Sequence, residues 1–195
     1  MPRKPRNLLD GGYYHVLTRG NDKRRLFRDD RDHKFFLNTI ERYLDKFQIR
    51  IVHYCLMPTH LHFLARLDAS GDLSKFMQGI LQVYAVYYRS KYNSCGFVFQ
   101  NRYKSLFIGA EAYLLECGRY IERNPLRAGL VVNIGDYCWS SYSFYANGNK
   151  DGLVSLVNPL YLDLADKKEK RQIIYQNYVS TQRPYDLIVD KALKI

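Results

Sequence analysis

The sequence predicts an α+β fold in which two helices cover one face of an antiparallel sheet. Two segments, residues 30–48 and 72–92, space their apolar side chains at helical intervals. Four shorter segments are rich in aromatic, β-branched and other apolar residues and are predicted as strands: residues 13–19, 49–57, 60–67 and 102–108. The resulting order, β-α-β-β-α-β, is the split βαβ pattern of ferredoxin-like folds.

Local signals mark where these elements begin and end. The first strand, Tyr13–Arg19, ends at the turn formers Gly20 and Asn21, and a basic loop then leads to the first helix. Pro58-Thr59 turns the second strand into the third, and Ser70-Gly71-Asp72 caps the second helix. Each helix thus lies between two strands, as the split βαβ pattern requires.

A further helix and an extension follow the fourth strand. The helix runs from Glu111 to about Arg123 and is expected to stop at Asn124-Pro125, because proline disfavours helical geometry in the residue before it. Beyond residue 132 the hydrophobic pattern is less regular. A short helix is expected over residues 139–145 and a basic amphipathic helix over residues 163–182. The chain is therefore divided into a domain and a partly helical extension packed on it: residues 1–132 and 133–195.

Composition and charge limit the class of protein. With 195 residues, 47% of them hydrophobic, the chain can bury one core and carry a small appendage. It lacks an apolar stretch of the roughly 20 residues that span a bilayer, and its basic N-terminus is not followed by a signal-like segment, so we expect a cytoplasmic protein. A net charge of +11 predicts an anionic partner. Nucleic acid is favoured over an acidic membrane surface, because the 18 tyrosines and 10 phenylalanines include rings that can stack on unpaired bases.

Two histidines stand at the start of the third strand. His60 and His62 are one residue apart on an extended segment, so both point to the same side of the sheet. Their neighbours form a wholly apolar face, so the imidazoles are expected on the opposite, free surface of the sheet, where such a pair can bind a metal ion. Alternatively, both are ordinary polar residues of a half-exposed strand. His15 either faces the same surface or is a similar polar strand residue. The apolar face consists of Leu61, Phe63, Ala65 and Leu67.

Tyr120 and Asn124 lie four residues apart on the helix after the fourth strand, so they share one face of it. A phenol can act as a covalent nucleophile when a metal ion or nearby arginines favour the phenolate, and an amide oxygen can be a further metal ligand. Taken alone, Tyr120 is better interpreted as a buried aromatic and Asn124 as a helix stop. Together with the two histidines, the catalytic interpretation is favoured. Tyr113 is a rival nucleophile, but it has no asparagine four residues later.

Three separated motifs resemble those of a known family. Pro58-Thr-His-Leu-His62 is similar to the HUH motif of single-tyrosine transposases, in which two histidines flank a hydrophobic residue. The stretches from Tyr14 to Asn21 and from Tyr120 to Gly129 resemble the REP-associated tyrosine transposase branch of these insertion-sequence transposases. The resemblance covers about residues 13–145, where Trp139-Ser-Ser-Tyr142 also fits. One departure is Thr59, where the family usually has asparagine.

This resemblance implies a metal-dependent DNA transposase, an endonuclease and strand transferase that acts on single-stranded DNA at hairpin repeats. Tyr120 would attack the scissile phosphate and form a 5′-phosphotyrosine link, which makes the helix that carries it a catalytic helix. His60, His62 and Asn124 would bind a divalent metal ion, magnesium or manganese. We expect a monomer rather than a homodimer, because the C-terminal extension could cover surface that a partner would use.

Basic side chains close to the predicted site are expected to bind DNA phosphates. They lie on the N-terminal arm, after the first strand, on the fourth strand and beside the tyrosine. The alternative for each is a solvated surface charge. The candidates are Arg3, Lys4, Arg6, Arg19, Lys23, Arg24, Arg25, Arg102, Lys104, Arg119, Arg123 and Arg127.

Two alternative functions stay open at this point. A replication-initiator or relaxase-type nickase would use the same chemistry for another purpose. A non-catalytic, domesticated protein that binds single-stranded nucleic acid is also compatible with the fold, because RNA-recognition modules are built on a similar sheet. Such a binder needs neither the histidine pair nor Tyr120, and it would bind equally well after chelation of metal ions.

Overall fold

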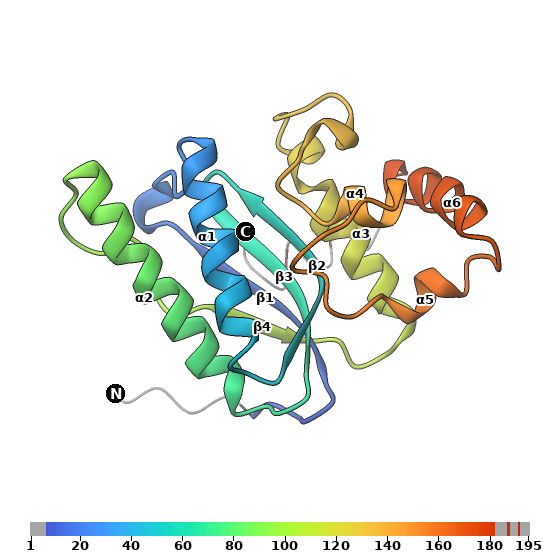
Figure 1. Cartoon of the computed structure of the whole chain (residues 1–195), viewed down its shortest axis with the longest axis horizontal. Helices are drawn as coiled ribbons and strands as arrows, with labels where there is room; N and C mark the ends of the chain where they lie inside the picture. Colours follow the sequence, from blue (N-terminus) through green and yellow to red (C-terminus); the bar gives the residue numbers. More distant parts are fainter. Residues whose placement is uncertain (1–6, 182–186, 188–190, 192–195) are drawn as a thin grey trace.

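The computed structural model of the chain describes residues 7–181, 187 and 191. Its centre is an antiparallel sheet of four strands in the order β2-β3-β1-β4 (Figure 1). The predicted fold class is therefore confirmed, although the fourth strand is shorter than expected. The strands are β1 (Tyr13–Arg19), β2 (Ile49–Met57), β3 (His60–Leu67) and β4 (Lys104–Phe107).

Two long helices lie side by side on one face of the sheet (Figure 1). The carboxylate of Asp29 accepts the backbone N–H of Asp32 at 3.1 Å and so begins the first of them with a capping box. Gly79 lets the two helices approach closely, because a Cβ at this position would overlap the ring of Tyr43. The first helix ends earlier than the sequence predicts. The two helices are α1 (Asp30–Leu44) and α2 (Asp72–Tyr92).

The apolar face of β3 forms the main core together with these helices. Aromatic residues of the helices complete it, among them Phe36 and Tyr84, whose ring centroids are 4.9 Å apart. Burial of each large apolar side chain stabilises the fold by about 1.5–3 kcal/mol. The side chains of β3 on this face are all buried, as the alternation predicts: Leu61, Phe63, Ala65 and Leu67.

The opposite face of the sheet is covered by α3 (Ala112–Arg127). Leu17 and Leu64 of the sheet pack against Leu114 and Ile121 of this helix in a second buried cluster. The expectation of a free surface around the histidines is therefore wrong. The alternation along one strand shows which side chains point away from the helices α1 and α2. It does not show that a distant segment of the chain covers these side chains.

The helix α3 also continues past the predicted stop at Asn124-Pro125. Proline has no N–H to donate to the carbonyl four residues earlier, which is that of Ile121. The side-chain amide of Asn124 donates to this carbonyl at 3.3 Å and to the carbonyl of Tyr120 at 2.9 Å. Asn124 thus supplies a hydrogen bond that Pro125 cannot make, and the helix ends only before Gly129, which has a φ of 65°.

The C-terminal extension is built from short elements that pack on α3 and on one another. Tyr145, Tyr161 and Tyr175 are buried at the centre of this packing. None of the helices in the described part of the chain is both long and apolar enough to cross a membrane. The remaining elements are two 3₁₀ turns, Asn21–Lys23 and Ile134–Asp136, and the helices α4 (Tyr142–Asn147), α5 (Pro159–Leu162) and α6 (Lys168–Ser180).

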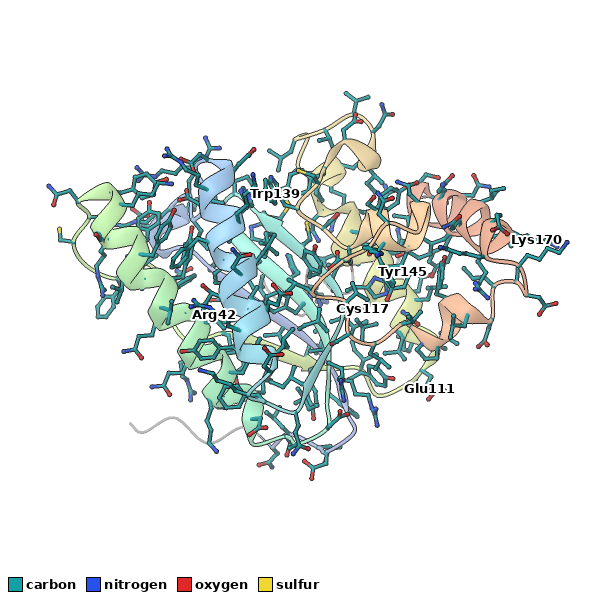
Figure 2. The ribbon with its side chains drawn as sticks, in the orientation of Figure 1. Arg42, Glu111, Cys117, Trp139, Tyr145 and Lys170 are labelled. Carbon is teal, nitrogen blue, oxygen red and sulfur yellow. The ribbon has the colours of Figure 1, made fainter. Side chains whose placement is uncertain are left out.

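Residues 137–156 run along the outer edge of β2. The N–H of Leu56 donates to the carbonyl of Trp139 at 2.9 Å, and the N–H of Ser141 donates to the carbonyl of Tyr54 at 3.0 Å. Farther along the edge, Ser155 exchanges hydrogen bonds with Ile51 in both directions, each 3.0 Å long. Trp139 itself lies beside the upper end of α1 (Figure 2). The extension is thereby joined to the sheet through the backbone.

Candidate active site

The histidine pair lies between β3 and α3. The ring centroids of His60 and His62 are 5.0 Å apart, and the rings are almost perpendicular. His62 is fully buried, and His60 is half-buried. The Nε2 atoms of both rings are shielded from solvent, and neither has a hydrogen-bond partner among the described residues. Two buried imidazole nitrogens without a partner are what a metal site needs from its ligands.

The other nitrogen of each ring is held by a neighbouring side chain. The Nδ1 atom of His60 is 3.0 Å from the hydroxyl of Thr59. The Nδ1 atom of His62 is 2.8 Å from Nε2 of His15, which is itself fully buried. His15 therefore faces the same side of the sheet as the pair. Such contacts at Nδ1 fix the orientation of a metal-binding imidazole.

Burial keeps these rings neutral at physiological pH. It lowers the pKa of His60 to about 4, with a smaller effect from the positive charge of Arg19. Burial also lowers the pKa of His62, and His60, His15 and Arg127 act in the same direction. A neutral imidazole keeps the lone pair that binds a metal ion, so the two histidines are ready to act as ligands without losing a proton.

Tyr120 lies against this cluster from the side of α3. Its ring meets those of His15 and His62 edge-on, with centroids 5.6 and 5.9 Å apart, and the side chain is fully buried. The guanidinium of Arg127 lies 5.1 Å from the centre of the Tyr120 ring. The rival nucleophile, Tyr113, is 52% exposed in the first turn of the same helix. Of the two tyrosines, Tyr120 is the one that α3 places against the histidines.

Asn124 follows Tyr120 by one helical turn and is buried. Its amide nitrogen is committed to backbone carbonyls of α3, so the amide oxygen is the atom that can serve as a ligand. No group of three or more His, Cys, Asp and Glu side chains in the described ranges could hold a metal ion. A divalent ion here would therefore depend on the two Nε2 atoms and on neutral oxygen donors such as Asn124.

A small pocket opens beside His60, with a volume of about 240 Å³. Arg19 and Lys23 give it positive charge, and Gly20 belongs to its wall. A Cβ at Gly20 would overlap the carbonyl oxygen of Arg24, so the chain can turn this tightly only with glycine. The pocket joins His60 to the basic loop after β1.

The predicted DNA contacts fall into three groups. Most are at least partly exposed: Arg19, Lys23, Arg24, Arg25, Arg102, Lys104 and Arg127. Arg19 and Lys23 line the His60 pocket and Arg127 contacts Tyr120, whereas Arg102 lines a groove along α2, on the other face of the sheet. Of these, Arg24 donates to Ser94 at 2.8 Å and lies over the ring of Tyr88. Those on the N-terminal arm lie outside the described residues: Arg3, Lys4 and Arg6.

Arg119 and Arg123 form the third group, and their expected role as phosphate ligands does not fit the structure. Both side chains are buried. Arg119 donates to Glu116 at 3.0 Å and to the carbonyl of Thr181 at 2.9 Å. Arg123 donates to the carbonyls of Val179 and Ser180. These arginines satisfy the free carbonyls at the end of α6, which also favour positive charge.

A buried polar network on the other side of α3 was missed by the sequence analysis. The carboxylate of Glu122 accepts hydrogen bonds from His53 at 2.8 Å, Ser141 at 2.6 Å and Tyr175 at 2.7 Å. Asn158 donates to the second nitrogen of His53 at 3.0 Å. The available signal was Glu122 itself, one of two acids in the helix. Its partners come from distant segments.

Comparisons with known proteins agree with this fold. The model of the family described as "Transposase IS200 like" matches residues 9–124. A solved structure of a REP-associated tyrosine transposase bound to a REP hairpin has a TM-score of 0.65 at 18% identity, covering 78% of this chain and 90% of that one. A protein assigned as a transposase from Deinococcus radiodurans has a TM-score of 0.43 at 13% identity, covering 66% and 92%, which is too low to define a shared fold. No curated protein matches the chain.

The matched segment contains the strands and most of the helix around the site. It begins before β1, includes His60 and His62 on β3, and ends at Asn124 on α3. It spans more than half of the 195 residues. The family expected from the three sequence motifs is therefore confirmed, and this chain belongs to the IS200-like transposase family.

Proposed function

We propose that this transposase is a metal-dependent strand transferase that cleaves and rejoins single-stranded DNA at hairpin repeats, with Tyr120 as the nucleophile. One observation carries the proposal. Tyr120 packs against two histidines whose Nε2 atoms are buried and have no hydrogen-bond partner within the described residues. Membership of the family supports a DNA-processing enzyme of the transposase type.

The metal site would be formed by Nε2 of His60, Nε2 of His62 and the amide oxygen of Asn124. These residues fit a divalent cation because the nitrogens are neutral and buried, and because the Asn124 amide nitrogen is already committed. Magnesium or manganese, when bound, would polarise a phosphoryl oxygen of the substrate and offset the charge that develops there.

Tyr120 would supply the covalent step. Its phenol oxygen forms a bond to the scissile phosphorus while the bond from phosphorus to the 3′-oxygen breaks. The phenol loses its proton, and the departing oxygen gains one to become a free 3′-OH. Arg127, over the Tyr120 ring, would hold a positive charge beside the nucleophile. Since one phosphodiester replaces another, a 3′-OH can reverse the step and rejoin DNA without a separate energy source.

The DNA would reach the site along the positive rim of the His60 pocket. Arg19 and Lys23 line this pocket, and the basic residues Arg24 and Arg25 follow in the same loop. The matched REP-associated structure was solved with a hairpin bound, which supports a DNA hairpin as the partner of this chain. We keep Arg3, Lys4 and Arg6 as proposed contacts of the same kind, and we propose a monomer as the active form.

A denaturing gel tests the proposal directly. Labelled single-stranded hairpin oligonucleotides, taken from repeats beside the gene, are incubated with the protein and magnesium or manganese. We expect a protease-sensitive covalent adduct that disappears with chelator and in Tyr120→Phe. Tyr113→Phe is the matched control on the same helix and should retain the adduct. Binding of the oligonucleotides should be nearly unchanged in both variants, because the lost hydroxyl is not a phosphate ligand.

Three results would contradict the proposal. An adduct that persists in Tyr120→Phe and disappears in Tyr113→Phe would assign the nucleophile to Tyr113. DNA that is bound but never cut, with both metals and several repeats, would indicate a non-catalytic binding protein. Nicking without any rejoining to an added 3′-OH strand would contradict the strand-transfer part of the proposal.

A further inference from the structure

We infer that His15 is a positioning residue that accepts the Nδ1 proton of His62 and so supports the metal-binding tautomer of that ring. This inference rests on the proposed function, because it assumes that His62 binds the cation through Nε2. His15 itself would touch neither the metal ion nor the DNA. It would act only through its hydrogen bond to His62.

The geometry of the sheet brings the two rings together. β1 and β3 are adjacent, with His15 opposite Leu64 and Leu17 opposite His62. Residues 62 and 64 are on the same face of β3, so His15 is the diagonal neighbour of His62 on that face. Nε2 of His15 is 2.8 Å from Nδ1 of His62, and both side chains are fully buried.

A hydrogen bond between two neutral imidazoles can be made in two ways. If Nδ1 of His62 donates, its Nε2 carries a lone pair and can bind a cation. If Nε2 of His15 donates, the proton of His62 sits on its own Nε2, which then cannot bind a cation. Only the arrangement in which His15 accepts is compatible with a metal site.

Neither arrangement is strongly preferred without a metal ion. When His15 accepts, its own proton lies on Nδ1, which is buried and has no partner among the described residues. When His15 donates, the proton of His62 lies on Nε2, which is equally buried and unpartnered. Each arrangement leaves one buried N–H unsatisfied. A cation at Nε2 of His62 would stabilise the first one, so metal binding and the direction of this hydrogen bond are coupled.

His60 has no equivalent constraint. Its Nδ1 atom faces the hydroxyl of Thr59, at 3.0 Å. A hydroxyl can donate or accept, so it adapts to either tautomer of His60. The contact whose direction is coupled to metal binding is therefore the one between His15 and His62, which is the more deeply buried of the two ligands.

Two variants of almost equal polarity separate this role from a packing role. In His15→Gln the side-chain oxygen is four bonds from Cα, as Nε2 is in histidine, so an acceptor can stay in front of His62. In His15→Asn the oxygen is one bond short of this position. Titration with Mn²⁺, followed by the EPR signal of the free ion, measures the dissociation constant of each protein without DNA.

We expect His15→Gln to bind Mn²⁺ within about threefold of the wild type, and His15→Asn to bind about 10- to 100-fold more weakly. Thermal unfolding of both variants checks that they are folded. Wild-type affinity in His15→Asn, or equal losses in both variants, would overturn the inference.

A second measurement needs no substitution. Long-range ¹H–¹⁵N NMR spectra identify which nitrogen of each histidine carries the proton. On addition of Mg²⁺, we expect His62 to be fixed with its proton on Nδ1. A proton that stays on Nε2 of His62 in saturating Mg²⁺ would overturn the inference.

The failure of the inference differs from the failure of the proposed function. Adduct formation that needs metal and Tyr120, with unchanged Mn²⁺ affinity in His15→Asn, would refute only the role of His15. Mn²⁺ binding that depends on His60, His62 and His15, without any adduct, would refute strand transfer and leave the role of His15 standing. Absence of Mn²⁺ binding in the wild type would refute both the metal site and this inference.

Discussion

His33 lies between two aromatic rings, with centroid distances of 4.6 Å to Phe27 and 4.3 Å to Trp139. Its Nδ1 donates to the carbonyl of Asp29 at 3.1 Å, and its Nε2 is buried without a partner in the described residues. Burial lowers the pKa of His33, and this effect exceeds the opposite one of the carboxylates of Asp30 and Asp32. His33 is therefore neutral at physiological pH, and it connects α1 to the C-terminal extension.

This stacking gives a prediction for pH dependence. Below pH 6.5 the unfolded chain takes up a proton at His33 before the folded one does, so stability decreases as the pH falls. Trp139 is the one tryptophan of the chain, and a protonated imidazole stacked on it quenches its emission. We expect the fluorescence of the folded protein to fall with a midpoint below pH 6.5. In His33→Gln this step should be absent, and a wild-type midpoint at or above pH 6.5 would contradict the assignment.

At the scale of one element, α3 connects the candidate active site with the extension. Tyr120 faces the histidines, whereas Glu122 points to the other side and accepts three hydrogen bonds. Gly118 packs against the ring of His53, where a Cβ would collide with Nε2. These contacts fix the rotation of α3 about its axis and its position along the sheet. They lie on the side of the helix opposite to Tyr120.

Loss of the Glu122 carboxylate should therefore destabilise the protein. We expect Glu122→Ala to lower the free energy of unfolding by about 3–5 kcal/mol, because buried donors lose their acceptor. Glu111→Ala is the matched control, since Glu111 is exposed before the same helix (Figure 2). It should change stability by less than about 0.5 kcal/mol. Urea unfolding measures both, and a loss below about 1 kcal/mol in Glu122→Ala would refute the anchoring role.

Local patterns were sufficient to predict most elements of the sheet and its covering helices. The two-residue alternation of β3 and the helical spacing in α1 and α2 depend on neighbours in the chain. The end of α3 could not be predicted in this way, because the amide of Asn124 replaces the hydrogen bond that Pro125 cannot donate. Arg119 and Arg123 were misassigned for a related reason, since their carbonyl partners lie more than 50 residues away along the chain.

The same limit applies to the candidate site. His60, His62, Tyr120 and Asn124 were predicted as site residues from their spacing on one strand and one helix. The contact of His15 with His62 joins residues 47 positions apart and depends on the register of β1 against β3. The site is buried because α3 packs across this face of the sheet. The sequence pattern of neither β3 nor α3 alone predicts that packing.

At the scale of the whole molecule, the extension and the sheet share their cores. Leu115 of α3 packs with Ile134 and Tyr161 of the extension. Leu153 and Val154 pack against the main core. The boundary that the sequence suggested at residue 132 therefore separates segments that bury one another's side chains.

Removal of residues 133–195 tests this dependence. The shortened chain would leave Glu122 without the hydroxyls of Ser141 and Tyr175 and would uncover one side of α3. We expect it to lose cooperative unfolding in urea, followed by far-UV circular dichroism, while the full chain unfolds in one transition. A sharp transition of the shortened chain, with a midpoint close to that of the full chain, would show that the first 132 residues fold alone.

The segment along the outer edge of β2 has a consequence for self-association. An open strand edge is a template on which another chain can add a strand, and this is a common route to aggregates. Here the outward backbone groups of Ile51, Tyr54 and Leu56 already bond to residues 137–156. A second copy cannot extend the sheet at β2 without displacing that segment. The opposite edge strand is β4, which has four residues. A strand from another copy of this transposase could therefore form only a few backbone hydrogen bonds with either edge of the sheet.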